Sequence, residues 1–149
     1  ESLVSRISPA AQKLIQTFWP GPLTLIMPRS ARLSEAVTGG RDSVGVRMPA
    51  HPVALQLLNA TGCALCGTSA NISGEKSAAC GAEVKTRLGG QVDYIVDAGP
   101  APGGIESTIV DLTTPVARIL RIGPVSREEI SKICQVEIGG STHESRHRK

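Results

Sequence analysis

The chain has 149 residues, 40% of them hydrophobic and 19% charged, with a formal net charge of +3. This length and composition predict a single globular domain and argue against a disordered or multi-domain chain. No apolar run approaches the ~18 residues of a membrane span, so we expect a soluble protein. The four cysteines favour a reducing, cytoplasmic location, because a chain of this size needs no disulfide framework. Since the first residue is Glu1 rather than Met, we expect that a preceding segment is missing.

Most of the net charge lies at the C-terminal end. Residues 141–149 hold three basic side chains against one acidic side chain, and so contribute +2 of the +3. The rest of the chain is nearly neutral and contains only three aromatic residues, which disfavours nucleic-acid binding as the main function. We expect residues 1–135 to form the domain and residues 136–149 to be a basic tail or the start of a linker.

The first half of the chain predicts helices and strands in mixed order. Ser8 followed by Pro9 is typical of a helix start, and the Trp-Pro-Gly-Pro turn at 19–22 ends that helix. Apolar runs then predict strands over 23–27 and 43–48. A short helix is predicted over 51–60, ended by Gly62, and a strand over 63–68.

The second half continues the mixed pattern. We predict a helix over 83–88, a strand over 93–97 and a turn-rich loop over 100–104. Two β-rich runs, 107–112 and 117–122, predict a hairpin. Ser126 and Glu129 have the spacing of a capping box, which predicts a last helix running to about Cys134. The chain is therefore expected to be an α/β protein.

Several common site motifs do not occur. The sequence has neither the Gly-x-Gly-x-x-Gly dinucleotide turn nor the Gly-x4-Gly-Lys-Ser/Thr phosphate loop. Cys63 and Cys66 have the spacing of a zinc or redox pair, but no second Cys or His pair follows at ligand distance. We therefore predict no protein-bound metal.

The stretch from Thr68 to Gly74 follows the predicted strand 63–68 directly and is rich in hydroxyl groups, with one amide. Polar groups at the carboxyl end of a strand lie where open α/β sheets bind ligands, and they could hold phosphate or carboxylate oxygens. An ordinary turn followed by a loop explains the stretch about equally well. Both interpretations stay open on the residues alone.

A second group of candidates combines hydroxyls with arginines. Ser107 and Thr108 follow Gly103-Gly104, which would let a ligand approach the backbone, although strand propensity alone explains the run after Ser107. Arg47 and Arg121 each interrupt an apolar run, and each either extends into solvent or points at a bound anion. No Ser-His-Asp, His-rich or paired-carboxylate set occurs. Anion binding is therefore favoured over acid–base hydrolysis.

Five motifs in one order carry a resemblance to a known family. The motifs are WPGPLT at 19–24, VGVRMP at 44–49, SANISG at 69–74, ESTIVD at 106–111 and LRIG at 120–123. In this order and spacing the chain resembles the YrdC/TsaC family, the threonylcarbamoyl-AMP synthases, from residue 8 to about residue 134. The resemblance implies a twisted, open, mixed α/β sheet with flanking helices and a concave ligand cavity.

The resemblance also implies a reaction and its substrates. The family condenses L-threonine, bicarbonate and ATP to L-threonylcarbamoyl-adenylate and pyrophosphate, with Mg²⁺ on the phosphates, for the t6A modification of tRNA. Downstream threonylcarbamoyl-transfer proteins would be partners, and tRNA or double-stranded RNA would be a further contact. By motif, the implied ATP contacts are Ser43, Ser69, Asn71, Ser77 and Arg121. The implied L-threonine contacts are Arg47, Gly67 and Ser107, and no catalytic residue is assigned.

The chain departs from the family pattern at its start. The family's Lys-x-Arg element and a threonine-binding Thr precede the Trp-Pro-Gly-Pro turn, whereas this chain begins too late to contain them. Lys85-Thr86-Arg87 matches the Lys-x-Arg pattern, but it follows the Ser-x-Asn motif instead of preceding the Trp-Pro-Gly-Pro turn, so it is not the equivalent element. We therefore expect the C-terminal two-thirds of the family domain, inactive by itself. Two alternatives stay open: a double-stranded-RNA-binding module without catalysis, and a carbamoyl-adenylate-forming module of a carbamoyltransferase.

Overall fold

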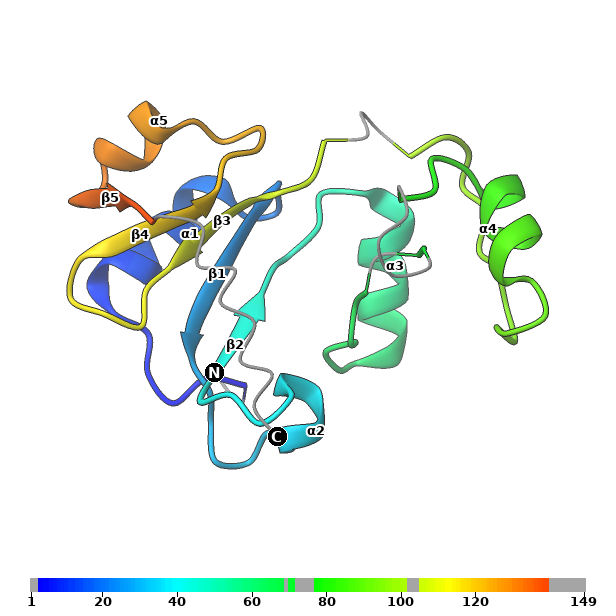
Figure 1. Ribbon diagram of the computed structural model, residues 1–149, viewed down its shortest axis with the longest axis horizontal. Coiled ribbons are helices and arrows are strands. Elements are labelled where there is room, and N and C mark those ends of the chain that lie inside the picture. Colours follow the sequence, from blue (N-terminus) through cyan, green and yellow to red (C-terminus); the bar gives the residue numbers. More distant parts are fainter. Residues whose placement is uncertain (1–2, 69, 72–76, 102–104, 140–149) are drawn as a thin grey trace, which may run out of the picture. The chain divides into compact units, whose positions relative to one another are not determined.

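The computed structural model describes residues 3–68, 70–71, 77–101 and 105–139 (Figure 1). The chain divides into two compact units, residues 1–50 together with 106–149, and residues 51–105. None of the helices in the described ranges is long and apolar enough to cross a membrane.

The first unit is built on a mixed five-stranded sheet with the strand order β2-β1-β3-β4-β5. Its strands are β1 (Leu23–Pro28), β2 (Ser43–Val46), β3 (Thr108–Asp111), β4 (Ala117–Arg121) and β5 (Val136–Ile138). β1 pairs antiparallel with β2 and parallel with β3, while β4 pairs antiparallel with β3 and parallel with β5. The predicted mixed α/β sheet is confirmed, and so is the hairpin of β3 and β4.

One face of this sheet carries the core. Burial alternates along β1, where Leu23, Leu25 and Met27 are buried, as expected for a strand with one covered face. The same cluster includes buried residues of α1 (Pro9–Phe18) and α5 (Arg127–Ser131), which flank the sheet (Figure 1). Thr24, between two buried leucines, therefore lies on the opposite face.

The predicted ends of α1 and the cap of α5 are confirmed. The Ser8 hydroxyl accepts a hydrogen bond from the Ala11 amide at 3.2 Å, and Pro9 occupies the first turn. Ser126 and Glu129 form the capping box. The α5 helix ends at Ser131, three residues before the predicted Cys134, and the chain then enters β5. The sheet thus includes three residues, 136–138, of the segment that the sequence assigns to the tail. The domain boundary after residue 135 stays a prediction.

The second unit contains α3 (Pro52–Thr61) and α4 (Gly81–Leu88). Gly62 ends α3 in the left-handed conformation, with φ of 62°, as the sequence predicts. The strands predicted over 63–68 and 93–97 are wrong: both segments are exposed and adopt no regular structure. Apolar residues alone do not make a strand, which also needs a neighbouring strand to bond its backbone.

A one-turn helix, α2 (Glu35–Thr38), was not predicted. Its four residues are too few to show a helical period in the sequence, and the Ser34 side chain caps it by accepting a hydrogen bond from the Ala36 amide. β2 is two residues shorter than the strand predicted over 43–48.

Candidate functional site

Four polar side chains lie in a row across neighbouring strands of the first unit. Arg47 follows β2, Thr24 lies on β1, Ser107 precedes β3 and Arg121 ends β4. The strand register brings them to one end of the sheet, because Leu23 pairs with Thr108, Leu25 with Val46 and Ile109 with Arg121. We call these four residues the strand-end row. The row lies on the sheet face opposite the core.

The contact between Ser107 and Arg121 holds one end of the row together. Arg121 Nε donates to the Ser107 carbonyl oxygen at 3.0 Å, and Nη2 donates to the Ser107 hydroxyl at 3.4 Å. Nη1 forms an ion pair with Glu106. Three nitrogens thus fix the plane of the guanidinium, and the remaining N–H groups on Nη1 and Nη2 are available to an anion.

The backbone around this contact is held by the buried hydroxyl of Thr108. Thr108 Oγ1 donates to the Val125 carbonyl oxygen at 2.7 Å and accepts from the amides of Gly123 at 2.8 Å and Val125 at 3.1 Å. Gly123 packs so closely that an added Cβ would lie 2.2 Å from the Glu106 carbonyl oxygen. The Leu-Arg-Ile-Gly motif therefore combines an arginine of the strand-end row with a glycine that lets β4 approach the start of β3.

Arg47 at the other end of the row is anchored to the turn before β1. Its Nε donates to the Gly21 carbonyl oxygen at 3.0 Å, and the Gly21 amide donates to the Met48 carbonyl oxygen at 2.8 Å. Gly21 is buried, and a Cβ there would lie 2.1 Å from the Phe18 carbonyl oxygen. The turn motif thus orients Arg47 and leaves both Nη groups of its guanidinium for a ligand.

The chemistry of the row suits an anionic ligand. Two guanidinium groups flank two hydroxyls, Thr24 Oγ1 and Ser107 Oγ, which lie 2.8 Å apart. Planar guanidinium groups bind carboxylate and phosphate oxygens in bidentate fashion, and Glu106 offsets one of the two positive charges. No titratable pair in the row is placed for acid–base chemistry.

Three of the predicted site residues lie together in the first unit. Arg47, Ser107 and Arg121 share the row. Ser43 lies at the opposite end of β2, where it pairs with Pro28. Gly67, Asn71 and Ser77 belong to the second unit, in which Gly67 and Ser77 are exposed and Asn71 is half-buried. Ser69 and Gly103-Gly104 lie outside the described residues.

The contacts of two residues in this site were not predicted from the sequence. Thr24 belongs to the Trp-Pro-Gly-Pro-Leu-Thr motif, and its alternation with Leu23 and Leu25 was a signal that its hydroxyl faces away from the core. Glu106 carried no local signal, because its partner Arg121 is 15 residues away in the sequence.

The described residues contain no group of three or more His, Cys, Asp or Glu side chains that could hold a metal ion. Cys63 and Cys66 are exposed free thiols, and Cys80 is a half-buried free thiol. Burial raises the pKa of the remaining thiol, Cys134.

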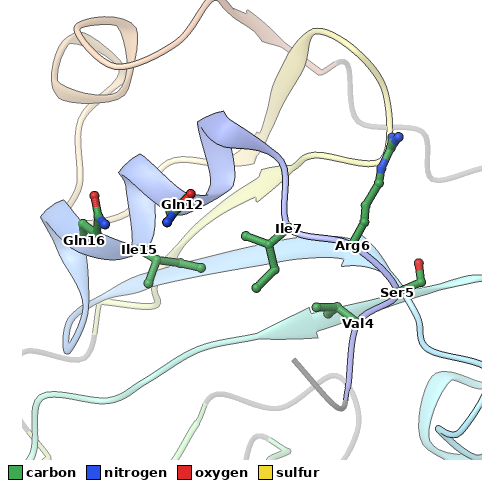
Figure 2. Close-up of a pocket in the computed structure, with 7 residues that line it drawn as sticks. All are labelled: Val4, Ser5, Arg6, Ile7, Gln12, Ile15 and Gln16. Atoms are coloured by element: carbon green, nitrogen blue, oxygen red, sulfur yellow. The ribbon is translucent and has the colours of Figure 1, made fainter.

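Two cavities are lined by residues outside the strand-end row. The first, of about 610 Å³, lies beside α1, where Val4, Ile7 and Ile15 form a row below the helix (Figure 2). The second, of about 510 Å³, is lined by residues of α4 and of the 92–97 segment. Neither is lined by a predicted site residue, so the concave ligand cavity implied by the resemblance is not one of these two.

Comparisons with known proteins converge on one family. The family model described as "Telomere recombination", which covers Sua5, YciO and YrdC proteins, matches residues 1–123. The threonylcarbamoyl-AMP synthase of Pyrococcus abyssi is 41% identical over 133 residues, which cover 89% of this chain and 39% of that protein. The synthase of Bacillus subtilis is 38% identical over 134 residues, with the same two coverages of 89% and 39%.

Solved structures agree with these sequence matches. The crystal structure of Pyrococcus abyssi Sua5 complexed with L-threonine has a TM-score of 0.86 and 39% identity, and the match covers 92% of this chain and 41% of that one. The crystal structure of Escherichia coli YciO has a TM-score of 0.77 and 28% identity, over 85% of this chain and 62% of that one. The chain thus spans about two-fifths of the length of the two synthases.

Proposed function

The chain belongs to the Sua5/YciO/YrdC family, and from this premise we propose that the protein is an L-threonylcarbamoyladenylate synthase. The proposed reaction condenses L-threonine, bicarbonate and ATP to threonylcarbamoyl-AMP and pyrophosphate. The names of the Pyrococcus abyssi and Bacillus subtilis relatives support it. So does the L-threonine complex of Pyrococcus abyssi Sua5, because its fold matches this chain at a TM-score of 0.86.

The observation that carries the proposal is the strand-end row. Arg47 would hold the threonine carboxylate with the two Nη groups that its contact to Gly21 leaves available. Ser107 would lie beside the amino acid, and Arg121 would bind phosphate oxygens of ATP. Because Arg121 donates to Ser107 directly, the two substrates would meet at this contact. A site that joins an amino acid to a nucleotide requires that proximity.

The role of these side chains would be positioning and charge stabilisation. In the proposed step an oxygen of N-carboxylated threonine attacks the α-phosphate of ATP, the bond to the leaving oxygen breaks, and pyrophosphate departs. Negative charge spreads over the phosphate oxygens, where the fixed guanidinium of Arg121 would stabilise it. Magnesium would enter with ATP and neutralise part of the triphosphate charge.

Further contacts are proposed from the family resemblance alone. Asn71, Ser77 and Ser69 are proposed to bind ATP, and Gly67 to leave room beside the amino acid. Ser43 is also proposed for ATP, but it lies four residues from Arg47 along an extended strand. At roughly 3.3 Å per residue that separates Ser43 from Arg47 by about 13 Å, so ATP would have to extend along β2 from the sheet end that holds Arg121 to reach Ser43.

The proposed product fits a cytoplasmic pathway. Threonylcarbamoyl-AMP is an activated intermediate, and proteins that transfer its threonylcarbamoyl group to tRNA would consume it in the t6A modification. The four free thiols favour a reducing compartment for this chemistry. A direct contact of this chain with tRNA is a further proposal, against which the near-neutral charge of residues 1–140 counts.

Substrate omission tests the function. The purified protein, produced as its gene encodes it, is given ATP, magnesium, L-threonine and bicarbonate, and pyrophosphate release is measured with each component left out in turn. We expect release to require both threonine and bicarbonate. Arg47→Lys should raise the KM for threonine, while Arg41→Lys, an exposed arginine of the loop before β2, should not. Release that persists without threonine would contradict the proposal.

A further inference from the structure

We infer that Thr24 is a positioning residue of the amino-acid site: its hydroxyl donates to Ser107 and so frees the Ser107 proton for an anionic oxygen of the substrate. This inference rests on the proposed function and deepens it. Thr24 is not among the residues that the family resemblance assigns to either substrate, and the structure places it between Arg47 and Ser107 in the strand-end row.

The contact joins two strands that are distant in sequence. Thr24 Oγ1 and Ser107 Oγ lie 2.8 Å apart across 83 residues. Thr24 pairs with Ile109 in the parallel register of β1 and β3, so Ser107 is its diagonal neighbour on the same face of the sheet. Ser107 is 7% exposed, and its hydroxyl is therefore largely shielded from water that could replace a lost partner.

Hydrogen-bond accounting favours one direction for this contact. A serine hydroxyl has one proton and two lone pairs. Arg121 Nη2 can only donate, so it uses one lone pair of Ser107. If Ser107 donated to Thr24, it would offer a ligand only its last lone pair. If Thr24 donates, Arg121 and Thr24 use both lone pairs of Ser107, and the Ser107 proton stays available to a ligand.

The charge of the row favours the arrangement in which Thr24 donates to Ser107. A ligand held between Arg47 and Arg121 presents carboxylate, carbamate or phosphate oxygens, all of which accept hydrogen bonds. The adjacent Arg121 guanidinium also polarises the Ser107 O–H group and makes it a better donor. Thr24 would thus set the direction of the Ser107 proton without touching the substrate.

Calorimetric titration with L-threonine tests this role. Thr24→Val keeps the shape and the strand propensity but removes the hydroxyl, so we expect the Kd for L-threonine to rise about three- to tenfold. Thr24→Ser should restore binding to within about twofold. Ile26→Val, the next residue on the same face of β1, is the matched control and should bind as the wild type does. Thermal melts of all variants check that each is folded.

A double-mutant cycle separates positioning from a general structural effect. If Thr24 acts through Ser107, Thr24→Val should add nothing further in a Ser107→Ala background. A Kd for Thr24→Val equal to the wild-type value, or additive losses in the double variant, would overturn the inference. Wild-type protein that binds threonine but releases no pyrophosphate would contradict the proposed function alone, because the Kd ratios would still decide the role of Thr24. Wild-type protein that does not bind threonine would overturn both.

Discussion

Arg121 and Ser107 are joined twice, by Nε to the serine carbonyl oxygen at 3.0 Å and by Nη2 to the serine hydroxyl at 3.4 Å. The first bond fixes the guanidinium to the backbone, and the second connects it to the hydroxyl pair. In the proposed reaction one residue binds the nucleotide and the other the amino acid. Their direct contact would therefore hold the two substrates next to each other.

Replacing Arg121 by lysine should remove most of the activity. Lysine keeps the positive charge but lacks the planar fork that bonds Ser107 and Glu106 together. Loss of one charge-assisted phosphate contact is worth about 1.5–3 kcal/mol, so kcat/KM for ATP should fall roughly ten- to a hundredfold. Steady-state kinetics with varied ATP measure this change.

Arg118→Lys is the matched control for that experiment. Arg118 lies on the same strand, but it pairs with Asp111 at the other end of β3. We expect its kcat/KM for ATP to stay within about twofold of the wild-type value. Equal losses in the two variants would mean that Arg121 acts through the stability of β4 and not through the phosphates.

Gly123→Ala should destabilise the first unit. The added Cβ would lie 2.2 Å from the Glu106 carbonyl oxygen and 2.6 Å from the Thr108 amide nitrogen, and both are backbone atoms at or just before the start of β3. Overpacking of this kind costs about 1–3 kcal/mol, which should lower Tm by several degrees. Gly90→Ala, where a Cβ would meet no atom within 4 Å, serves as the control. An unchanged Tm for Gly123→Ala would show that β4 can move away from β3.

Asp111 should contribute a pH-dependent part of the stability. Burial opposes its charge, but hydrogen bonds from the side chain and amide of Thr113, together with Arg118, outweigh burial and lower its pKa below the ordinary 3.8. A carboxyl whose pKa is lower in the folded state stabilises the fold above its unfolded pKa, and this contribution fades as pH falls through the folded value.

Urea titrations across pH measure that contribution. At pH 7 Asp111→Asn should unfold about 1–2 kcal/mol more easily than the wild type, because it replaces a charged acceptor by a neutral amide. The difference should shrink as the pH falls below about 4. Asp93→Asn, which removes an exposed carboxyl of the second unit, is the matched control. A wild-type advantage that grows toward low pH would refute the assignment.

The two units should differ in hydrogen exchange. Leu23, Leu25 and Val110 of the sheet are fully buried, whereas α3 and α4 contain no buried residue. Local stability follows burial, so amides of α3 and α4 should exchange well before those of β1 and β3. Mass spectrometry of the exchanging protein resolves these segments, and equal protection of α3 and β1 would contradict the burial argument.

Features set by neighbouring residues were predictable from the sequence. The start of α1 at Ser8-Pro9, the Gly62 end of α3 and the capping box of α5 depend on residues within one helical turn. The β3–β4 hairpin was also predictable, because two β-rich runs flank a short turn.

Features set by distant partners were not predictable in the same way. The segments 63–68 and 93–97 have strand-like sequences, but the residues that the structure describes provide no neighbouring strand for them. The sequence did not decide whether the Arg121 side chain extends into solvent or points at a bound ligand. The irregular register near Ile109 and the contact to Ser107 fix its direction. The contact of Thr24 with Ser107 spans 83 residues, so no local pattern could show it.

Mass spectrometry of the product is the most direct test of the proposed reaction. The protein, produced as its gene encodes it, is incubated with ATP, magnesium, L-threonine and isotopically labelled bicarbonate, and the nucleotide products are identified by mass. We expect threonylcarbamoyl-AMP that carries the bicarbonate label, formed in equal amount with pyrophosphate and abolished when threonine is omitted. A carbamoyl-adenylate formed from carbamoyl phosphate without threonine, or no adenylate at all, would contradict it.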